Sequence, residues 1–287
     1  MKTRLLVVFH LYYHQQLDYY LGKMANICGC DWDLLVTVTE EREATLSKLK
    51  AFKSDVTVLK VENAGYDIWP FIAAIRTVDL SRYDFVMKLH TKNANLRINR
   101  INGLPLRKYM WRSLLVNSFL KSPESFSHAL HRLQSNPSAG MICSRELYRK
   151  LTENSPEEVS LLRREMARLG IPMKDPHFCA GTMFIVRASL LGPFRDSDIE
   201  AECFSGQMSS HSFGSLAHTY ERILSFAVSG AGHKIILQGS DRGCCILSTL
   251  NRGLSPLLEN IFAITRLGEE RRKYLIIFGM RFCLDSD

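Results

Sequence analysis

The segment Phe85-Val-Met-Lys-Leu-His-Thr-Lys92 is an apolar run that becomes charged toward its end. Lys88, His90 and Lys92 alternate along it at a spacing of two residues. Residues at this spacing on an extended chain point to the same side. Ligands of open α/β sheets bind beyond the carboxyl ends of parallel strands. Three such side chains at a strand end therefore predict a site for an anionic ligand such as a phosphate.

Three further apolar runs precede this segment, and they set the fold class. Leu5–Phe9, Trp32–Thr39 and Val56–Val61 are expected to be buried strands, because they are nearly continuous runs rich in valine, leucine and threonine. The segments between the strands are expected to be helical: Asp18–Asn26, Glu40–Phe52 and Phe71–Val78, the last opened by Pro70. Strands that alternate with helices predict a Rossmann-type, mostly parallel sheet flanked by helices.

The rest of the chain is expected to complete this sheet. Ala139–Cys143 and Gly232–Leu237 have the pattern of strands, and in Phe178–Arg187 a glycine is followed by an apolar strand. Asn93–Arg107 is rich in basic and amide side chains and is expected to be a loop that closes over a ligand. Four more segments are expected to be helices: Lys108–Leu120, Pro123–Leu133, Pro156–Leu169 and Ser215–Val228.

Composition is that of a globular protein with a basic balance. The chain has 287 residues, of which 46% are hydrophobic and 23% charged, and its net charge is +8. A basic surface suits nucleic acid, an anionic membrane or phosphorylated substrates. We expect no nucleic-acid partner, because no basic helix with interleaved aromatic residues and no zinc-finger pattern is visible.

The cysteines and the apolar runs predict a cytoplasmic protein. The eight cysteines include no pair of CxxC units, so a structural zinc site is not expected. Leu5–Phe9 is too short for the apolar region of a signal peptide. No stretch approaches the roughly twenty apolar residues of a membrane-spanning helix.

A second polar segment follows the third predicted strand. In Asn63-Ala-Gly-Tyr-Asp67, Asn63 and Gly65 allow the backbone to turn tightly and to approach a ligand closely. Asp67 is a strong acceptor for a ligand hydroxyl. The alternative is a structural role, in which Asp67 caps the helix that follows.

Two later motifs supply groups for chemistry. Gly181 opens an apolar strand and would permit close approach of a ligand, although a plain core strand fits too. His218, Glu221 and Arg222 share one face of a predicted helix at i, i+3 and i+4. Glu221 or His218 would suit a general base, and Arg222 would hold a phosphate or orient Glu221. The alternative is a structural network. Asp175 is a weaker candidate for the base.

These motifs together resemble a known family. The blocks Asn63–Phe71, Lys88–Lys92, Gly181-Thr-Met-Phe184 with Arg187, and His218-x-x-Glu221-Arg222 are similar in order and spacing to the rhamnan synthesis protein F family over roughly residues 4–240. The resemblance implies a GT-A-like bacterial glycosyltransferase of cell-wall and O-antigen polysaccharide assembly. It also implies inverting transfer of a deoxyhexose, commonly L-rhamnose from dTDP-β-L-rhamnose. Ser215 departs from the threonine that the family often has.

The resemblance also implies roles for the motif residues. The nucleotide-sugar would be bound by Asn63, Gly65, Asp67, Lys88, His90, Lys92 and Arg222. The acceptor would lie against Gly181 and Thr182, and the base would be Glu221, His218 or Asp175.

Most GT-A enzymes have an Asp-x-Asp pair at this strand end, and that pair holds Mg²⁺ or Mn²⁺ beside the leaving diphosphate. Here Lys-x-His-x-Lys stands in its place. Because ammonium groups repel a cation, we expect transfer without a metal, with Mg²⁺ or Mn²⁺ dependence as the alternative.

The C-terminal part is expected to be an extension, residues 251–287, on a transferase domain of residues 1–250. Arginine and lysine alternate with leucine, isoleucine and phenylalanine in it, a pattern that favours peripheral contact with the cytoplasmic membrane face. A lipid-linked glycan acceptor would make such contact useful.

Two other functions stay open: a non-catalytic nucleotide-sugar-binding protein and a sugar nucleotidyltransferase. Phe9–Tyr13 argues against the latter, because that enzyme class usually has a glycine-rich loop there.

Overall fold

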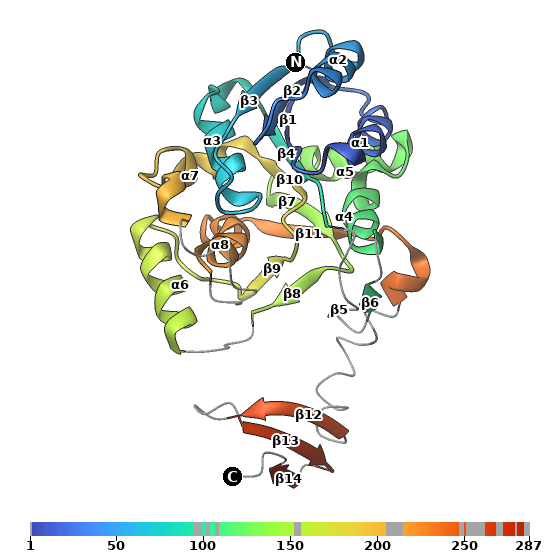
Figure 1. Ribbon diagram of the computed structural model, residues 1–287. Coiled ribbons are helices and arrows are strands. Elements are labelled where there is room, and N and C mark those ends of the chain that lie inside the picture. The colour runs from blue at the N-terminus through green and yellow to red at the C-terminus, as the bar shows by residue number, and fades with distance from the viewer. Residues whose placement is uncertain are drawn as a thin grey trace.

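The computed structural model describes residues 2–93, 99–101, 104–106, 109–151, 156–204, 215–246, 250, 262–267, 272–278 and 280–283. A seven-stranded sheet runs through its main body, with helices on both faces (Figure 1). The predicted fold class, a mixed α/β protein with a mostly parallel sheet flanked by helices, is therefore confirmed.

The sheet has the strand order β11-β7-β10-β4-β1-β2-β3. All neighbouring strands pair in parallel except β10, which runs antiparallel to both β4 and β7. The pairing of β1 with β4 sets His10 opposite His90, so both strands end at the same edge. The strands are β1 (Arg4–His10), β2 (Asp31–Val38), β3 (Thr57–Lys60), β4 (Phe85–His90), β7 (Ala139–Ser144), β10 (Phe184–Arg187) and β11 (Lys234–Gln238).

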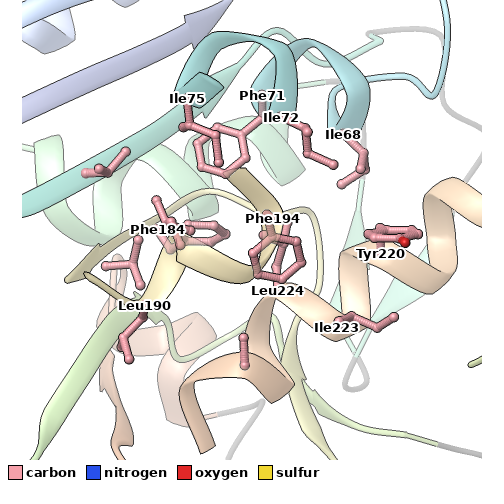
Figure 2. Packing of buried hydrophobic residues seen from close by; sticks show 14 of the residues in the cluster. Ile68, Phe71, Ile72, Ile75, Phe184, Leu190, Phe194, Tyr220, Ile223 and Leu224 are labelled. Carbon is pink, nitrogen blue, oxygen red and sulfur yellow. The ribbon is translucent and has the colours of Figure 1, made fainter. Parts of the chain in front are cut away.

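Two hydrophobic cores lie on the two faces of the sheet. Alternate residues of β1 enter different cores: Leu6 and Val8 one, and Leu5, Val7 and Phe9 the other. This explains why the strand is a continuous apolar run. The first core is covered by α3 (Ile68–Arg76), α6 (Pro156–Arg168), α7 (Gly192–Arg195) and α8 (Leu216–Gly230), and Figure 2 shows part of its packing. The second is covered by α1 (Leu17–Met24), α2 (Glu43–Phe52), α4 (Met110–Leu120) and α5 (Pro123–Gln134).

Two local expectations were wrong, and a third was incomplete. The strand expected after Gly181 is β10, but residues before that glycine form another strand, because β9 (His177–Cys179) pairs with β8 (Tyr148–Lys150) before the chain turns into β10. The loop expected over Asn93–Arg107 contains an antiparallel hairpin, β5 (Asn99–Ile101) and β6 (Leu104–Leu106), and its other residues lie mostly outside the described ones. Helix α3 begins at Ile68, two residues before Pro70. Proline is tolerated there because N–H groups of the first turn have no intrahelical partner.

The C-terminal strands form a sheet of their own. β12 (Phe262–Leu267), β13 (Arg272–Ile277) and β14 (Met280–Cys283) pair antiparallel in sequence order (Figure 1). The predicted domain boundary at residue 251 lies outside the described residues and stays a prediction.

In the described part of the chain, no helix is both long and apolar enough to cross a bilayer. Short 3₁₀ segments complete the fold: His14–Gln16, Leu80–Arg82, Ala188–Leu191 and Ala201–Phe204.

Candidate functional site

The site lies beyond the carboxyl ends of β1 and β4, where the chain enters α3. Gly65 and Tyr66 both adopt the left-handed region, with φ of 61° and 56°. A Cβ on Gly65 would lie 2.8 Å from the Phe204 ring, so this close approach requires glycine. Asp67 follows at the N-cap of α3, but its side chain makes no capping hydrogen bond. The structural alternative, in which Asp67 caps the helix, is therefore not the arrangement that its carboxylate adopts.

Asp67 instead forms a buried ion pair with Lys88. The Lys88 ammonium donates to Asp67 Oδ2, to Thr182 Oγ1 at 3.0 Å and to the Thr182 carbonyl at 3.2 Å. The Thr182 hydroxyl in turn donates to Asp67 Oδ2 at 2.5 Å. An ammonium group has three donors, and all three have acceptors here. Lys88 is 1% exposed, so it has no donor left for a ligand and holds Asp67 in place.

The charge state of the pair follows from its surroundings. Burial alone would raise the pKa of Asp67, but His90, Lys88 and Lys92 outweigh it and hold that pKa well below the usual range. Burial lowers the pKa of the Lys88 ammonium, with the Asp67 carboxylate acting in the opposite direction. The proton stays on Lys88, because an aspartate with so low a pKa remains ionised.

His90 lies on the same side of β4 as Lys88, as the spacing of two residues predicts. Its Nε2 is 2.8 Å from the Gly181 carbonyl oxygen and 3.5 Å from Asp67 Oδ2. Burial lowers the pKa of His90 well below its usual value, so the ring is neutral near pH 7. Both ring nitrogens face a carbonyl oxygen, which only accepts: Nε2 that of Gly181, and Nδ1 that of Thr91 at 3.2 Å. The shorter contact with Gly181 favours the proton on Nε2.

The motif His218-x-x-Glu221-Arg222 lies on α8 and contacts the same turn through Glu221. Glu221 Oε1 accepts a hydrogen bond of 2.6 Å from the Gly181 N–H, and the Gly181 carbonyl accepts from His90. One residue therefore connects two motifs that are far apart in the sequence. Ser215 caps α8 and lies 2.6 Å from His218 Nδ1, and burial lowers the pKa of His218.

The remaining predicted residues are placed differently. Asn63 is exposed, and the Lys92 ammonium lies 4.8 Å from the centre of the Trp111 ring. Asp175 belongs to a different cluster, in which His177 Nδ1 is 2.6 Å from its carboxylate and the Tyr148 hydroxyl donates to it at 3.4 Å. No contact in the described part of the chain joins Asp175 to Asp67 or Glu221, so it is the least supported of the three candidates for the base.

Arg149, Tyr20 and Tyr66 also belong to this site, and the sequence patterns did not reveal them. The Tyr20 hydroxyl donates to the His90 carbonyl at 2.5 Å, and the exposed Tyr66 ring lies 6.0 Å from the His218 ring. Arg149 interacts electrostatically with Glu221. Of these three residues only Tyr66 had a signal in the sequence: it follows Gly65, and a glycine indicates a turn at this point.

The side chains at this edge of the sheet do not suit Mg²⁺ or Mn²⁺ as ligands, because these cations prefer oxygen atoms. Asp67 is already neutralised by Lys88, and the neighbouring side chains are basic. Among the residues that the structure describes, no group of three or more His, Cys, Asp or Glu side chains is arranged to hold a metal ion. Metal independence itself stays a prediction.

Replacing Gly181 with alanine is expected to lower the free energy of unfolding by about 1–3 kcal/mol. Gly181 has φ of 88°, and an added Cβ would lie 2.8 Å from both Leu115 Cδ1 and Trp111 Nε1. Urea unfolding measures the loss. Gly232 is a matched control, because its φ is 84° but a Cβ there would meet nothing within 4 Å. Equal losses at both positions would show that backbone strain, rather than crowding at the site, requires Gly181.

Curated relatives and solved structures resemble this chain over most of its length. Uncharacterized proteins WxcX from two strains of Xanthomonas campestris pv. campestris are 26% and 25% identical over 232 residues, which is 80% of this chain and 32% of each relative. The chain thus spans about a third of the length of these relatives.

Solved structures agree with the backbone only in part. S. aureus TarS 1–349 in complex with UDP has a TM-score of 0.43 at 11% identity, covering 87% of this chain and 65% of that one. Mannosyltransferase PcManGT from Pyrobaculum calidifontis, in complex with GDP-Man and Mn²⁺, has a TM-score of 0.41 at 11% identity, covering 83% and 55%. The family model of rhamnan synthesis protein F matches residues 1–233, most of the sequence, and the chain therefore belongs to the rhamnan synthesis protein F family.

Proposed function

We propose that this chain is an inverting glycosyltransferase of cell-surface polysaccharide synthesis that works without a metal. Its donor would be a nucleotide-activated deoxyhexose, with dTDP-β-L-rhamnose the first choice. The observation that carries the proposal is the Gly181–Thr182 turn, which holds Glu221 on one side and Asp67 on the other amid basic side chains. Membership of the family supports the polysaccharide.

Asp67 is suited to bind a hydroxyl of the donor. Its Oδ2 accepts from Lys88 and Thr182, whereas no hydrogen bond to Oδ1 is present among the described residues. The side chain is 16% exposed, so Oδ1 can accept from a sugar or ribose hydroxyl. A carboxylate fixed by an ion pair binds such a group without a further loss of side-chain freedom.

Glu221 is the best supported base. The Gly181 N–H fixes Oε1, and no hydrogen bond engages Oε2 in the described part of the chain. In the proposed reaction Glu221 accepts the proton of an acceptor hydroxyl. The hydroxyl oxygen then bonds to the anomeric carbon as the bond from that carbon to the diphosphate oxygen breaks. The basic side chains stabilise the negative charge of the departing diphosphate.

The C-terminal sheet supports an acceptor at a membrane. Phe278, Met280 and Phe282 are exposed by 76%, 56% and 47%, and arginines flank them in the sequence. Exposed apolar side chains beside basic ones bind anionic bilayers. We therefore propose a lipid-linked glycan as acceptor and peripheral contact with the cytoplasmic membrane face.

Nucleotide release in the presence of EDTA tests the function. The purified chain is incubated with a glycan acceptor and, separately, dTDP-β-L-rhamnose, a UDP-sugar and a GDP-sugar, and free nucleoside diphosphate is measured. We expect release from dTDP-β-L-rhamnose at the same rate with and without EDTA, because basic side chains take the place of the cation. Activity that disappears in EDTA and returns with Mn²⁺ would contradict metal independence. Donor binding without turnover would instead support the non-catalytic alternative.

A further inference from the structure

Lys88 has no hydrogen-bond donor left for a ligand, so other cationic side chains must bind the leaving diphosphate. Arg222 on α8 is the first of them. It is only 7% exposed, and arginine is almost never so deeply buried without a partner. Yet among the residues that the structure describes, no hydrogen bond or ion pair satisfies its guanidinium. Its nitrogens are not among the fully enclosed polar atoms that lack a partner, so they reach accessible space.

Arg149 approaches the same place from β8. The strand pairs with β9, where Arg149 lies opposite Phe178. β9 in turn is attached to α8, because the Cys179 N–H donates to Ser225 Oγ at 3.0 Å. The half-buried Arg149 guanidinium interacts electrostatically with Glu221 and Arg222, and it too has no hydrogen bond or ion pair within the described residues. Burial lowers its pKa, with Glu221 acting in the opposite direction.

We propose that Arg149 and Arg222 form a two-arginine clamp for a diphosphate, on the α8 side of the Gly181–Thr182 turn. Lys88 is then a positioning residue, which acts through Asp67. The identity of the donor rests on the proposed function, but the clamp does not: it requires only a diphosphate.

The charges explain why the clamp selects a diphosphate. Two neighbouring guanidinium groups repel each other unless an anion lies between them, and Glu221 supplies one negative charge for both. Each guanidinium presents a planar fork that binds phosphate oxygens in pairs. A diphosphate has two phosphate groups and thus matches two forks. Two ligands carry this group, the nucleotide of the donor and the lipid diphosphate of an acceptor.

Calorimetric binding to the full chain tests the clamp. The probes are inorganic pyrophosphate, dTDP, dTMP and geranyl diphosphate, and the variants are Arg149→Gln, Arg222→Gln and the matched control Lys150→Gln. Lys150 neighbours Arg149 on the same strand and is exposed. We expect each arginine variant to weaken pyrophosphate and dTDP binding about 10- to 100-fold, and dTMP binding less, because charge-assisted hydrogen bonds are lost. Lys150→Gln should bind like the wild type.

The outcomes separate the clamp from its possible ligands and from the proposed function. If the variants weaken binding of pyrophosphate and dTDP but not of geranyl diphosphate, the clamp belongs to the donor. If they weaken binding of pyrophosphate and geranyl diphosphate but not of dTDP, it belongs to the acceptor. Unchanged pyrophosphate binding in Arg149→Gln would overturn the clamp. Because Arg149 is only half-buried, this variant also tests the clamp if Arg222→Gln does not fold. Arginine-dependent pyrophosphate binding in a chain that transfers no sugar would uphold the clamp and reject the function.

Discussion

Replacing Asp67 with asparagine is expected to lower the free energy of unfolding by about 3–5 kcal/mol and to abolish sugar transfer. The substitution keeps the shape of the side chain but removes its charge. It leaves the Lys88 ammonium, which is 1% exposed, without its anion. A buried charge that has lost its partner costs far more than the pair contributed. Urea unfolding measures the stability, and nucleotide release measures the activity.

A double variant separates the two effects. Asp67→Asn with Lys88→Met removes both charges, and uncharged residues of similar volume often restore the stability of a buried pair. We expect unfolding close to that of the wild type but no transfer, because the acceptor for the donor hydroxyl is still missing. Asp31→Asn is the exposed control. Its pair with Lys2 is 58% and 61% exposed, and pairs of this kind contribute about 0–1 kcal/mol. An Asp67→Asn variant as stable as Asp31→Asn would contradict the prediction.

The same pair predicts how stability depends on pH. The pKa of Asp67 is lower in the folded chain than in the unfolded one. Its contribution is therefore present above the unfolded value of about 3.9 and is lost as the pH falls through the folded value. Unfolding of the wild type below pH 4 should show this loss, whereas Asp67→Asn should lack it.

Much of the fold was predictable because it depends on local patterns. The strands β1, β2 and β4 are largely buried, so their sequences are apolar runs, whereas β3 lies at the sheet edge and is only partly buried. The bounds of all four agree with the predicted ones within two residues. The strand after Gly181 was predicted, but the antiparallel direction of β10 was not. Its direction depends on a turn at Gly181 and Thr182, in which both residues have positive φ. Threonine rarely adopts this conformation, so nothing in the pattern indicates that turn.

The site was predictable only as far as residue spacing determines it. Alternation correctly placed Lys88 and His90 on one side of β4. Their partner could not be predicted, since the Asp67–Lys88 contact depends on how the chain passes from β3 into α3. Arg149 was missed for a similar reason. It reaches Glu221 only because β8 pairs with β9 and β9 attaches to α8, and neither contact is local.

Replacing Glu221 with glutamine is expected to reduce kcat by about 10²- to 10⁴-fold, the usual contribution of a general base. The affinity for the nucleotide-sugar should change little, because glutamine keeps an oxygen that accepts from the Gly181 N–H. The turn that holds Thr182 would therefore persist. Steady-state kinetics with dTDP-β-L-rhamnose gives kcat and KM, and thermal unfolding checks the fold.

Parallel variants at the other two candidates assign the base. His218 is held by Ser215 three residues before Glu221, and burial lowers its pKa, so it is neutral near pH 7. His218→Gln should reduce kcat less than Glu221→Gln. The Glu221 carboxylate accepts a hydrogen bond from the Gly181–Thr182 turn, whereas the His218 imidazole contacts Ser215. Asp175→Asn should reduce it least, since that carboxylate is engaged with His177 and Tyr148. A larger fall for His218→Gln, with the acid limb of the pH profile removed, would transfer the role to His218. A fall confined to Asp175→Asn would place the chemistry beside the β8–β9 strand pair instead.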